Sequence, residues 1–131
     1  MHNNTISQFT IRLVPKTKGK INLSIKSDSK NNGRIQVMRS REDKTYIKEA
    51  GNYLKPLRIS YPVNVKVLFY ADSHRHFKLV NLLQMISDVL IKNSVICDGN
   101  NIIGYDGSRI LYDKHAPRTE ILISRMEHEE E

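Results

Sequence analysis

The sequence predicts an α+β fold in a single domain, with strands at both ends and two main helices between them. Residues 63–70 alternate apolar and polar side chains as a strand does, and residues 79–92 repeat apolar side chains at helical spacing. These elements do not follow the regular strand–helix–strand repeat of a parallel α/β protein. A chain of 131 residues with 39% hydrophobic residues can bury one core of ordinary size, which predicts one domain.

The first half of the chain is expected to hold one strand, a basic loop and one helix. Residues 9–14 alternate in the manner of a strand, and Pro15 ends it. Residues 16–34 are polar and basic, with an Asn-Asn-Gly turn signal, which is typical of a hairpin or loop. Ser40 followed by acidic residues has the pattern of a helix start, and the apolar stripe predicts a helix to about Leu54.

The second half is expected to alternate strands with one long helix. The alternation over residues 63–70 predicts a central strand, and the apolar stripe over residues 79–92 predicts an amphipathic helix. Residues 101–105 and 109–112 flank an Asp-Gly turn signal, so we expect a hairpin there. Residues 119–124 predict a last strand.

The charge divides the chain into a basic body and a short acidic tail. The sequence has 21 Lys and Arg against 14 Asp and Glu, a net charge of +7, yet four of the acids fall in the last five residues. The remaining 10 acids leave the body at about +11. We therefore expect a folded domain over residues 1–126 and a flexible acidic tail over residues 127–131. A basic body favours nucleic acid or another polyanion as a partner, although solubility alone would also explain it.

Several classes of protein are excluded or disfavoured by the composition. Cys97 is the single cysteine, so an internal disulfide and a thiolate zinc site are excluded, and a half-buried turn is expected around it. The chain has neither a long apolar run nor a signal-peptide pattern, which predicts a cytosolic protein. No nucleophile elbow, glycine-rich phosphate loop or Cys-His pairing points to a hydrolase, kinase or cysteine protease.

The run ADSHRHFKLVNLLQMISDVLIKNSVICDGNNIIGYDG places Asn81, Asp88 and Asp98 at fixed spacings. Leu90, Asn101 and Ile102 keep the same register. In these spacings, residues 61–126 resemble the RusA-type Holliday junction resolvases. The resemblance implies a RusA-like single domain with a mixed or antiparallel sheet, a homodimer, and a phage or prophage origin.

The departures from the family pattern bear on function. Family resolvases hold Mg²⁺ with paired carboxylates and use a nearby lysine for the reacting phosphate. The resemblance places the corresponding positions at Lys78, Val80, Gln84, Asp98 and Gly99. Only Asp98 keeps a carboxylate, so we expect a catalytically inactive homologue that needs no cofactor. The alternative is a divergent active resolvase, which would require Mg²⁺.

An improvised metal site is a separate hypothesis. Asp72, His74 and His76, with Asp98, could supply mixed nitrogen and oxygen ligands. The alternative is that residues 72–76 form a solvated loop, because alternate residues converge on one metal only when the segment is extended and faces a partner.

Two binding functions fit a RusA-like domain without its chemistry. In the first, the body binds branched or duplex DNA through Lys16, Lys18, Lys20, Arg34, Arg39 and Arg41. In the second, the protein binds a host nucleic-acid enzyme through its tail, as an antitoxin occupies the RNA groove of a MazF-type ribonuclease. The acidic residues that would do so are Glu127, Glu129, Glu130 and Glu131. A tail that only aids solubility is the alternative to the second function.

Overall fold

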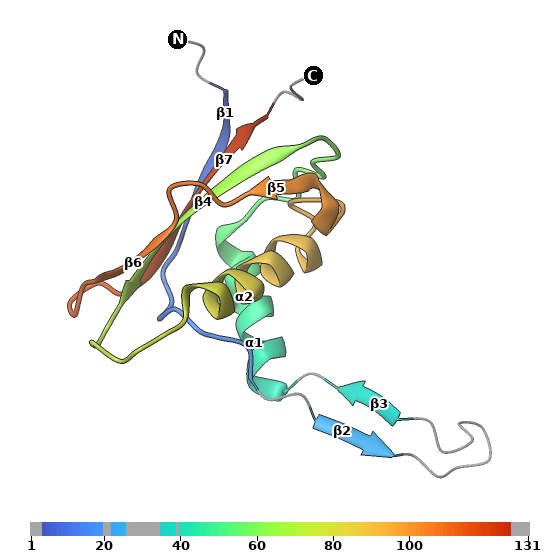
Figure 1. Ribbon diagram of the computed structural model, residues 1–131, viewed down its shortest axis with the longest axis vertical. Coiled ribbons are helices and arrows are strands. Elements are labelled where there is room, and N and C mark those ends of the chain that lie inside the picture. Colours follow the sequence, from blue (N-terminus) through green and yellow to red (C-terminus); the bar gives the residue numbers. More distant parts are fainter. Residues whose placement is uncertain (1–3, 20–21, 26–34, 39, 127–131) are drawn as a thin grey trace.

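The computed structural model describes residues 4–19, 22–25, 35–38 and 40–126, and it confirms the α+β class. Two helices lie on one side of a five-stranded mixed sheet, and a separate two-stranded sheet stands apart from it (Figure 1). The elements are β1 (Thr5–Ile11), β2 (Asn22–Ile25), β3 (Ile35–Met38), α1 (Arg41–Ala50), η1 (Gly51–Tyr53), β4 (Val63–Ala71), α2 (Leu79–Lys92), η2 (Gly99–Asn101), β5 (Ile102–Gly104), β6 (Arg109–Tyr112) and β7 (Arg118–Arg125).

Strand β4 is the centre of the five-stranded sheet. It pairs antiparallel with β7 along one edge, and β7 in turn pairs antiparallel with β1. Along its other edge it pairs parallel with β5 and then with β6. Val63, Val65, Val67 and Phe69 are buried under the helices, as the alternation of residues 63–70 predicts. The side chains between them face the side of the sheet that the helices leave uncovered.

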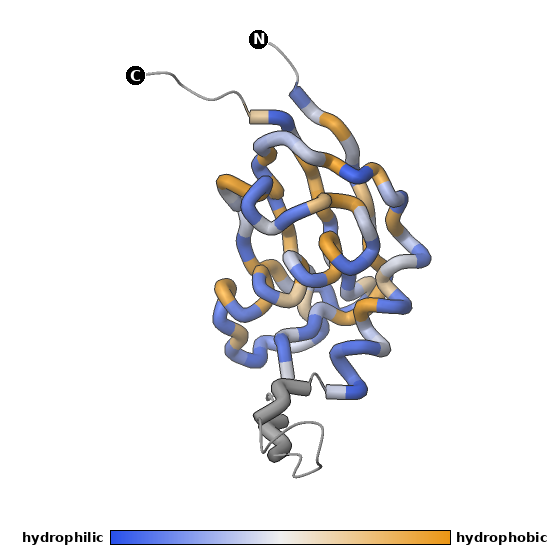
Figure 2. Tube along the Cα trace, turned by 90° about the vertical axis from the view of Figure 1, so that its right-hand side faces the viewer, coloured by the Kyte–Doolittle hydropathy of each residue, from blue (hydrophilic) through white to orange (hydrophobic). Residues whose placement is uncertain are grey.

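Helix α2 fills the covered face of the sheet and has the bounds that the sequence predicts. It buries Leu82, Met85, Ile86, Val89 and Leu90 in one hydrophobic core with the odd-numbered residues of β4. Figure 2 shows apolar and polar positions interleaved along the same strands and helices, as expected where each element buries only one face. The opposite face of α2 is therefore left for solvent or a ligand.

Helix α1 is shorter than the sequence predicts. It ends at Ala50 rather than near Leu54, and a 3₁₀ turn follows. Where α1 ends, the side-chain amide of Asn93, the C-cap residue of α2, donates to the carbonyl of Ile47 at 3.0 Å. Gly51 allows this approach, because a Cβ at its position would lie 2.4 Å from the Asn93 Oδ1 atom.

The N-terminal half follows the prediction with one shift. The first strand covers residues 5–11 instead of 9–14, because its register with β7 begins at polar residues that carry no alternation signal. Phe9 and Ile11 are buried on the same face, as predicted. Strands β2 and β3 pair antiparallel, so the second strand lies just beyond the predicted range of residues 16–34. The turn predicted at residues 31–33 lies outside the described residues.

The hairpin predicted for residues 101–105 and 109–112 is wrong. Strands β5 and β6 do not pair with each other, and both pair with β4 in parallel. In the segment that connects β5 and β6, side-chain hydrogen bonds to β4 take the place of backbone ladder bonds. Asn64 accepts from the Asp106 N–H at 2.8 Å and donates to its carbonyl at 3.2 Å, and Ser108 Oγ accepts from the Val67 N–H at 2.9 Å. The Asp-Gly turn therefore lets the chain bypass part of the β4 edge.

Two further features of the described chain concern exposure. Cys97, expected in a half-buried turn, is exposed between α2 and η2, and its N–H donates to the Ile59 carbonyl at 2.9 Å. Within the described ranges, neither helix has the length and apolar character to cross a bilayer.

The role of Ser108 predicts the effect of a single substitution. Ser108→Ala should lower the free energy of unfolding by about 1–3 kcal/mol, because it leaves the Val67 N–H on the central strand without its acceptor. Urea unfolding followed by circular dichroism measures this. Ser60→Ala, at an exposed position between β-bridge residue Ile59 and Tyr61, is the control. Equal stability of the two variants would contradict the proposed role of the hydroxyl.

Candidate nucleic-acid interface

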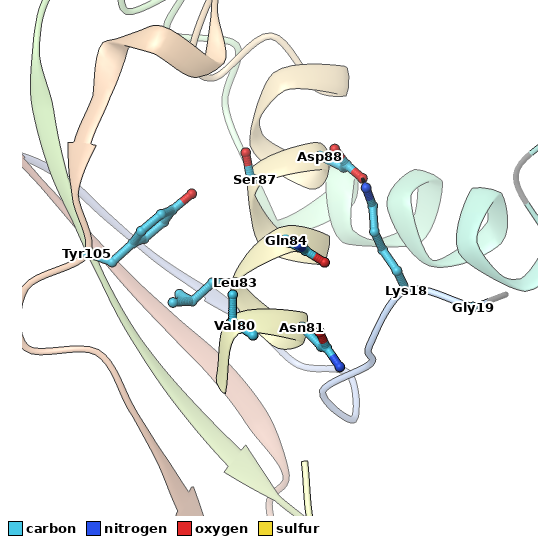
Figure 3. A pocket seen from close by; sticks show the side chains of 9 residues that line it. All are labelled: Lys18, Gly19, Val80, Asn81, Leu83, Gln84, Ser87, Asp88 and Tyr105. Carbon is cyan, nitrogen blue, oxygen red and sulfur yellow. Dashed lines mark ion pairs between the residues drawn. The ribbon is translucent and has the colours of Figure 1, made fainter. Parts of the chain in front are cut away.

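A groove of about 990 Å³ crosses the outer face of α2 (Figure 3). The helix forms its floor, because the apolar stripe of α2 is turned toward the sheet. One wall is formed by Lys18 and Gly19, and the other by Tyr105, directly after β5. We call residues 16–19 the basic wall, of which Lys18 and Gly19 line the groove. The lining residues are Lys18, Gly19, Val80, Asn81, Leu83, Gln84, Ser87, Asp88 and Tyr105.

The two sides of the groove differ in chemistry. Val80, Leu83 and Ser87 lie on the side of Tyr105, whereas Asn81, Gln84 and Asp88 lie on the side of Lys18 (Figure 3). Val80 is 58% exposed, although it is a branched apolar residue. A ligand lying across α2 would meet an apolar surface on one side and hydrogen-bonding groups on the other.

The basic wall is fixed to α1 by one carboxylate. Asp43 accepts the Lys16 ammonium and the Gly19 N–H, the latter at 3.0 Å to each carboxylate oxygen. The Asp43 N–H in turn donates to the Ser40 hydroxyl that caps the helix, at 3.2 Å. The cap predicted at Ser40 thus also orients the acid that holds the basic segment in place.

Opposing effects set the pKa of Asp43. Its burial raises the pKa, since only 3% of the residue is exposed. Hydrogen bonds from Lys16 and the Gly19 N–H, the charge of Lys16 and a hydrogen bond with Ser40 lower it, and together they prevail, so that the pKa lies below its ordinary value. Asp43 is therefore ionised at neutral pH and remains a partner for the basic segment.

A second carboxylate fixes the same segment to α2. The Lys18 ammonium lies 2.9 Å from Asp88 Oδ2, with 35% and 19% of the two side chains exposed. This ion pair crosses the polar side of the groove (Figure 3). Each helix therefore provides one acid that positions one lysine, and the wall is held from two directions.

The family positions on α2 lie at or beside the groove. Val80 and Gln84 line it, and Gln84 is exposed. Lys78 is the N-cap residue of α2 and is exposed, but its side chain makes no capping hydrogen bond. The first turn of α2 contains no acidic residue. This end of the groove therefore has positive and neutral groups where the family resemblance implies carboxylates.

The remaining family positions, Asp98 and Gly99, are engaged in a local turn. Asp98 caps η2, and its Oδ1 accepts from the Asn100 N–H at 2.8 Å. Gly99 is the first residue of η2. Neither residue is among those that line the groove.

The residues of the groove do not fit Mg²⁺. The ion prefers several hard oxygen ligands in octahedral geometry. Asp88 is the one carboxylate among the residues that line the groove, and Lys18 is already paired with it. A metal placed there would face an ammonium group at close range, which opposes its charge.

The separate metal hypothesis concerns the loop before α2. Asp72, His74 and His76 are all exposed, and the His74 ring stacks on the ring of Tyr112 with centroids 4.0 Å apart. In the part of the chain that the structure describes, no three His, Cys, Asp or Glu residues, Asp98 included, lie close enough to share a metal ion.

The candidates for nucleic-acid and partner binding are only partly placed. Lys16 and Lys18 lie in the basic wall, and Arg41 is the exposed first residue of α1. Three candidate cations and the acidic tail lie outside the described residues: Lys20, Arg34, Arg39, Glu127, Glu129, Glu130 and Glu131.

Sequence reasoning missed the aromatic residues of this surface. Tyr105 forms a wall of the groove, and Tyr112 stacks on His74, but neither was a candidate. Each lies at the end of a short strand where no periodicity marks it. The neighbouring Asp-Gly turn was the one available signal, since residues beside turns are often exposed.

Models of known protein families and the sequences of curated proteins were compared with this chain, and neither comparison gives a match.

The pKa of Asp43 predicts a dependence of stability on pH. Asp43→Asn should lower the free energy of unfolding by about 2 kcal/mol or more at neutral pH, because Lys16 and Gly19 lose an ionised acceptor. A lowered native pKa stabilises the fold above the unfolded pKa of about 3.9, and that stabilisation is lost as the pH falls through the native pKa. The difference between wild type and variant should therefore shrink in acid.

Urea unfolding from neutral pH down to about pH 2 measures this difference. Glu42→Gln changes an exposed acid in the same helical turn and is the matched control. An Asp43→Asn effect that is independent of pH, or no larger than that of Glu42→Gln, would contradict the assigned role.

Proposed function

We propose that this protein is a RusA-like binding protein without nuclease activity, and that its target is duplex or branched DNA in the cytosol of the host cell. The composition of the groove on α2 is the observation that carries the proposal. Its one carboxylate is paired with Lys18, and the adjacent end of α2 has Lys78 with no acid in the first turn. Such a groove suits an anion better than a metal.

The electrostatics of the α2 N-terminus support an anionic ligand. The end of a helix with free N–H groups carries a partial positive charge, and a cation is unfavourable there unless an anion lies nearby. Lys78 is a cation at this position, with no side-chain cap beside it. A phosphate group would bind both the helix end and the ammonium. Where a family enzyme reaches phosphate through carboxylates and a metal, Lys78 would contact it directly.

The positioning of the basic wall also supports the proposal. Lys16 and Lys18 are held by Asp43 and Asp88, so they need no reordering when a polyanion arrives. Lys16 retains 29% and Lys18 35% of side-chain exposure. An ammonium group has three donors, so each lysine can contact a phosphate while its carboxylate pair persists. The net charge of +7 adds a long-range attraction for DNA.

The proposal predicts salt-dependent DNA binding that uses Lys78. Affinity for a short duplex or a four-way junction should fall steeply between about 50 and 200 mM salt, and Lys78→Gln should reduce the slope of log affinity against log salt by about one unit. Fluorescence anisotropy measures both. Lys78 is the preferred test residue, because neutralising Lys16 or Lys18 would leave a carboxylate without its partner.

Lys92→Gln is the matched control, since Lys92 is an exposed lysine at the opposite end of the same helix. It should leave the salt slope unchanged. In the same samples, added Mg²⁺ or Mn²⁺ should leave the junction uncut. No binding of any DNA at low salt would refute the proposal, and metal-dependent cleavage that is abolished by Asp98→Asn would show an active resolvase instead.

A second proposal rests on the separation of charge along the sequence. Four of the last five residues are acidic, whereas the preceding body is strongly basic. An acidic strip of this kind could occupy the basic groove of a host nucleic-acid enzyme such as a MazF-type ribonuclease. The protein would then act as a dimeric, antitoxin-like inhibitor of phage origin.

Truncation after Met126 tests the second proposal. Loss of the tail should weaken the complex with a MazF-type ribonuclease by about 1 kcal/mol or more for each well-desolvated ion pair. Isothermal titration calorimetry measures the complex, and DNA affinity measured in parallel is the control, which should not fall. An unchanged affinity for the ribonuclease would remove the tail from the interface.

A further inference from the structure

An aromatic pair stands on the surface beside the start of α2. The ring of His74 lies on the ring of Tyr112 at 4.0 Å between centroids, with 26° between the ring planes. Tyr112 ends β6 and is still 45% exposed, so the stack leaves part of its ring open. The pair is separate from the groove on α2, because neither residue lines that groove.

A hollow of about 290 Å³ adjoins the aromatic pair. The loop that leads from β4 to α2 forms one side, and the end of β6 forms the other. Within the loop, the Arg75 guanidinium lies over the ring of Phe77, 5.3 Å from its centroid. The hollow thus combines exposed rings with a cation, all in reach of solvent.

A second hollow, of about 310 Å³, connects this aromatic surface to the basic wall. It shares Ser73, Arg75 and Phe77 with the first hollow, and Lys16 and Gly19 line its other side. Gly19 also lines the groove on α2. The second hollow therefore shares lining residues with both the aromatic hollow and the groove on α2.

The two hollows bring cations and aromatic rings together. Lys16 and Arg75 line the middle hollow, where Asp72 is the one acidic side chain among the lining residues. His74, Arg75 and His76 line the aromatic hollow. A strand of nucleic acid offers complementary groups, since its phosphates follow one another along the backbone while each base projects a flat aromatic face.

We propose that Tyr112 and His74 stack an unpaired nucleobase of a single-stranded or locally unpaired nucleic acid, while Lys16 and Arg75 contact the adjacent phosphates. Bases in an intact duplex have both faces covered by their neighbours and cannot reach the ring of Tyr112. The inference rests on the proposed binding of DNA and adds the class of substrate, namely DNA with at least one unstacked base.

Base stacking can be tested with 2-aminopurine, a base whose fluorescence is quenched when it stacks. One probe is a short single-stranded oligo-dT with a single 2-aminopurine, and the second is the same strand annealed to its complement. The wild-type protein should quench the single-stranded probe and leave the duplex signal unchanged. Tyr112→Ala should weaken binding of the single strand roughly 5- to 160-fold, the range for loss of one base–aromatic stack.

Three further variants test whether the effect depends on the aromatic ring of Tyr112. Tyr112→Phe preserves the ring and should retain both the quenching and the affinity. Tyr53→Ala removes a tyrosine of similar exposure, 36%, from η1 and should change neither. Lys78→Gln should weaken single-stranded and duplex DNA alike, because it acts on phosphate. Circular dichroism confirms that each variant is folded.

The possible outcomes separate the two proposals. Loss of single-strand affinity on Tyr112→Ala with duplex affinity retained is the expected result. If the protein binds both DNAs but the probe is not quenched, or if Tyr112→Ala weakens both equally, the stacking site is refuted while DNA binding stands. If no DNA of either form binds at low salt, the proposed function fails and the inference fails with it.

Discussion

The burial of one face of β4 is the constraint on which the arrangement depends. Val63, Val65, Val67 and Phe69 must all leave water, and α2 supplies the apolar stripe that covers them. The covering stripe occupies one side of α2, and the opposite side carries exposed residues such as Val80 and Gln84. The position of the groove is therefore a direct result of how the core is formed.

The sequence predicted the elements with a strong period and missed those fixed by single side chains. Residues 63–70 and 79–92 repeat their apolar positions often enough to identify both type and face. Strands β5 and β6 are three and four residues long, too short for a period to decide their partner. Their placement depends on Asn64 and Ser108, whose hydrogen bonds link residues 42 and 41 positions apart.

The candidate site could be predicted in part for the same reason. The family resemblance singled out Val80 and Gln84, and their spacing of four residues places both on one face of α2. The ion pair between Lys16 and Asp43 could not be predicted, because the two residues are 27 positions apart and nothing in the sequence distinguishes them from other charged residues. The aromatic pair likewise requires the loop after β4 to meet the end of β6. Long-range contacts between common residue types leave no pattern in one sequence.

The exposed thiol of Cys97 makes the chain well suited to single-site spectroscopy. As the only cysteine, it accepts one maleimide dye or spin label without any prior mutagenesis. It lies beyond the C-terminal end of α2, whereas the proposed anion site is at the N-terminus, and a helix of 14 residues is about 20 Å long. A label at Cys97 is thus remote enough to leave the groove open and close enough for energy transfer from a labelled oligonucleotide.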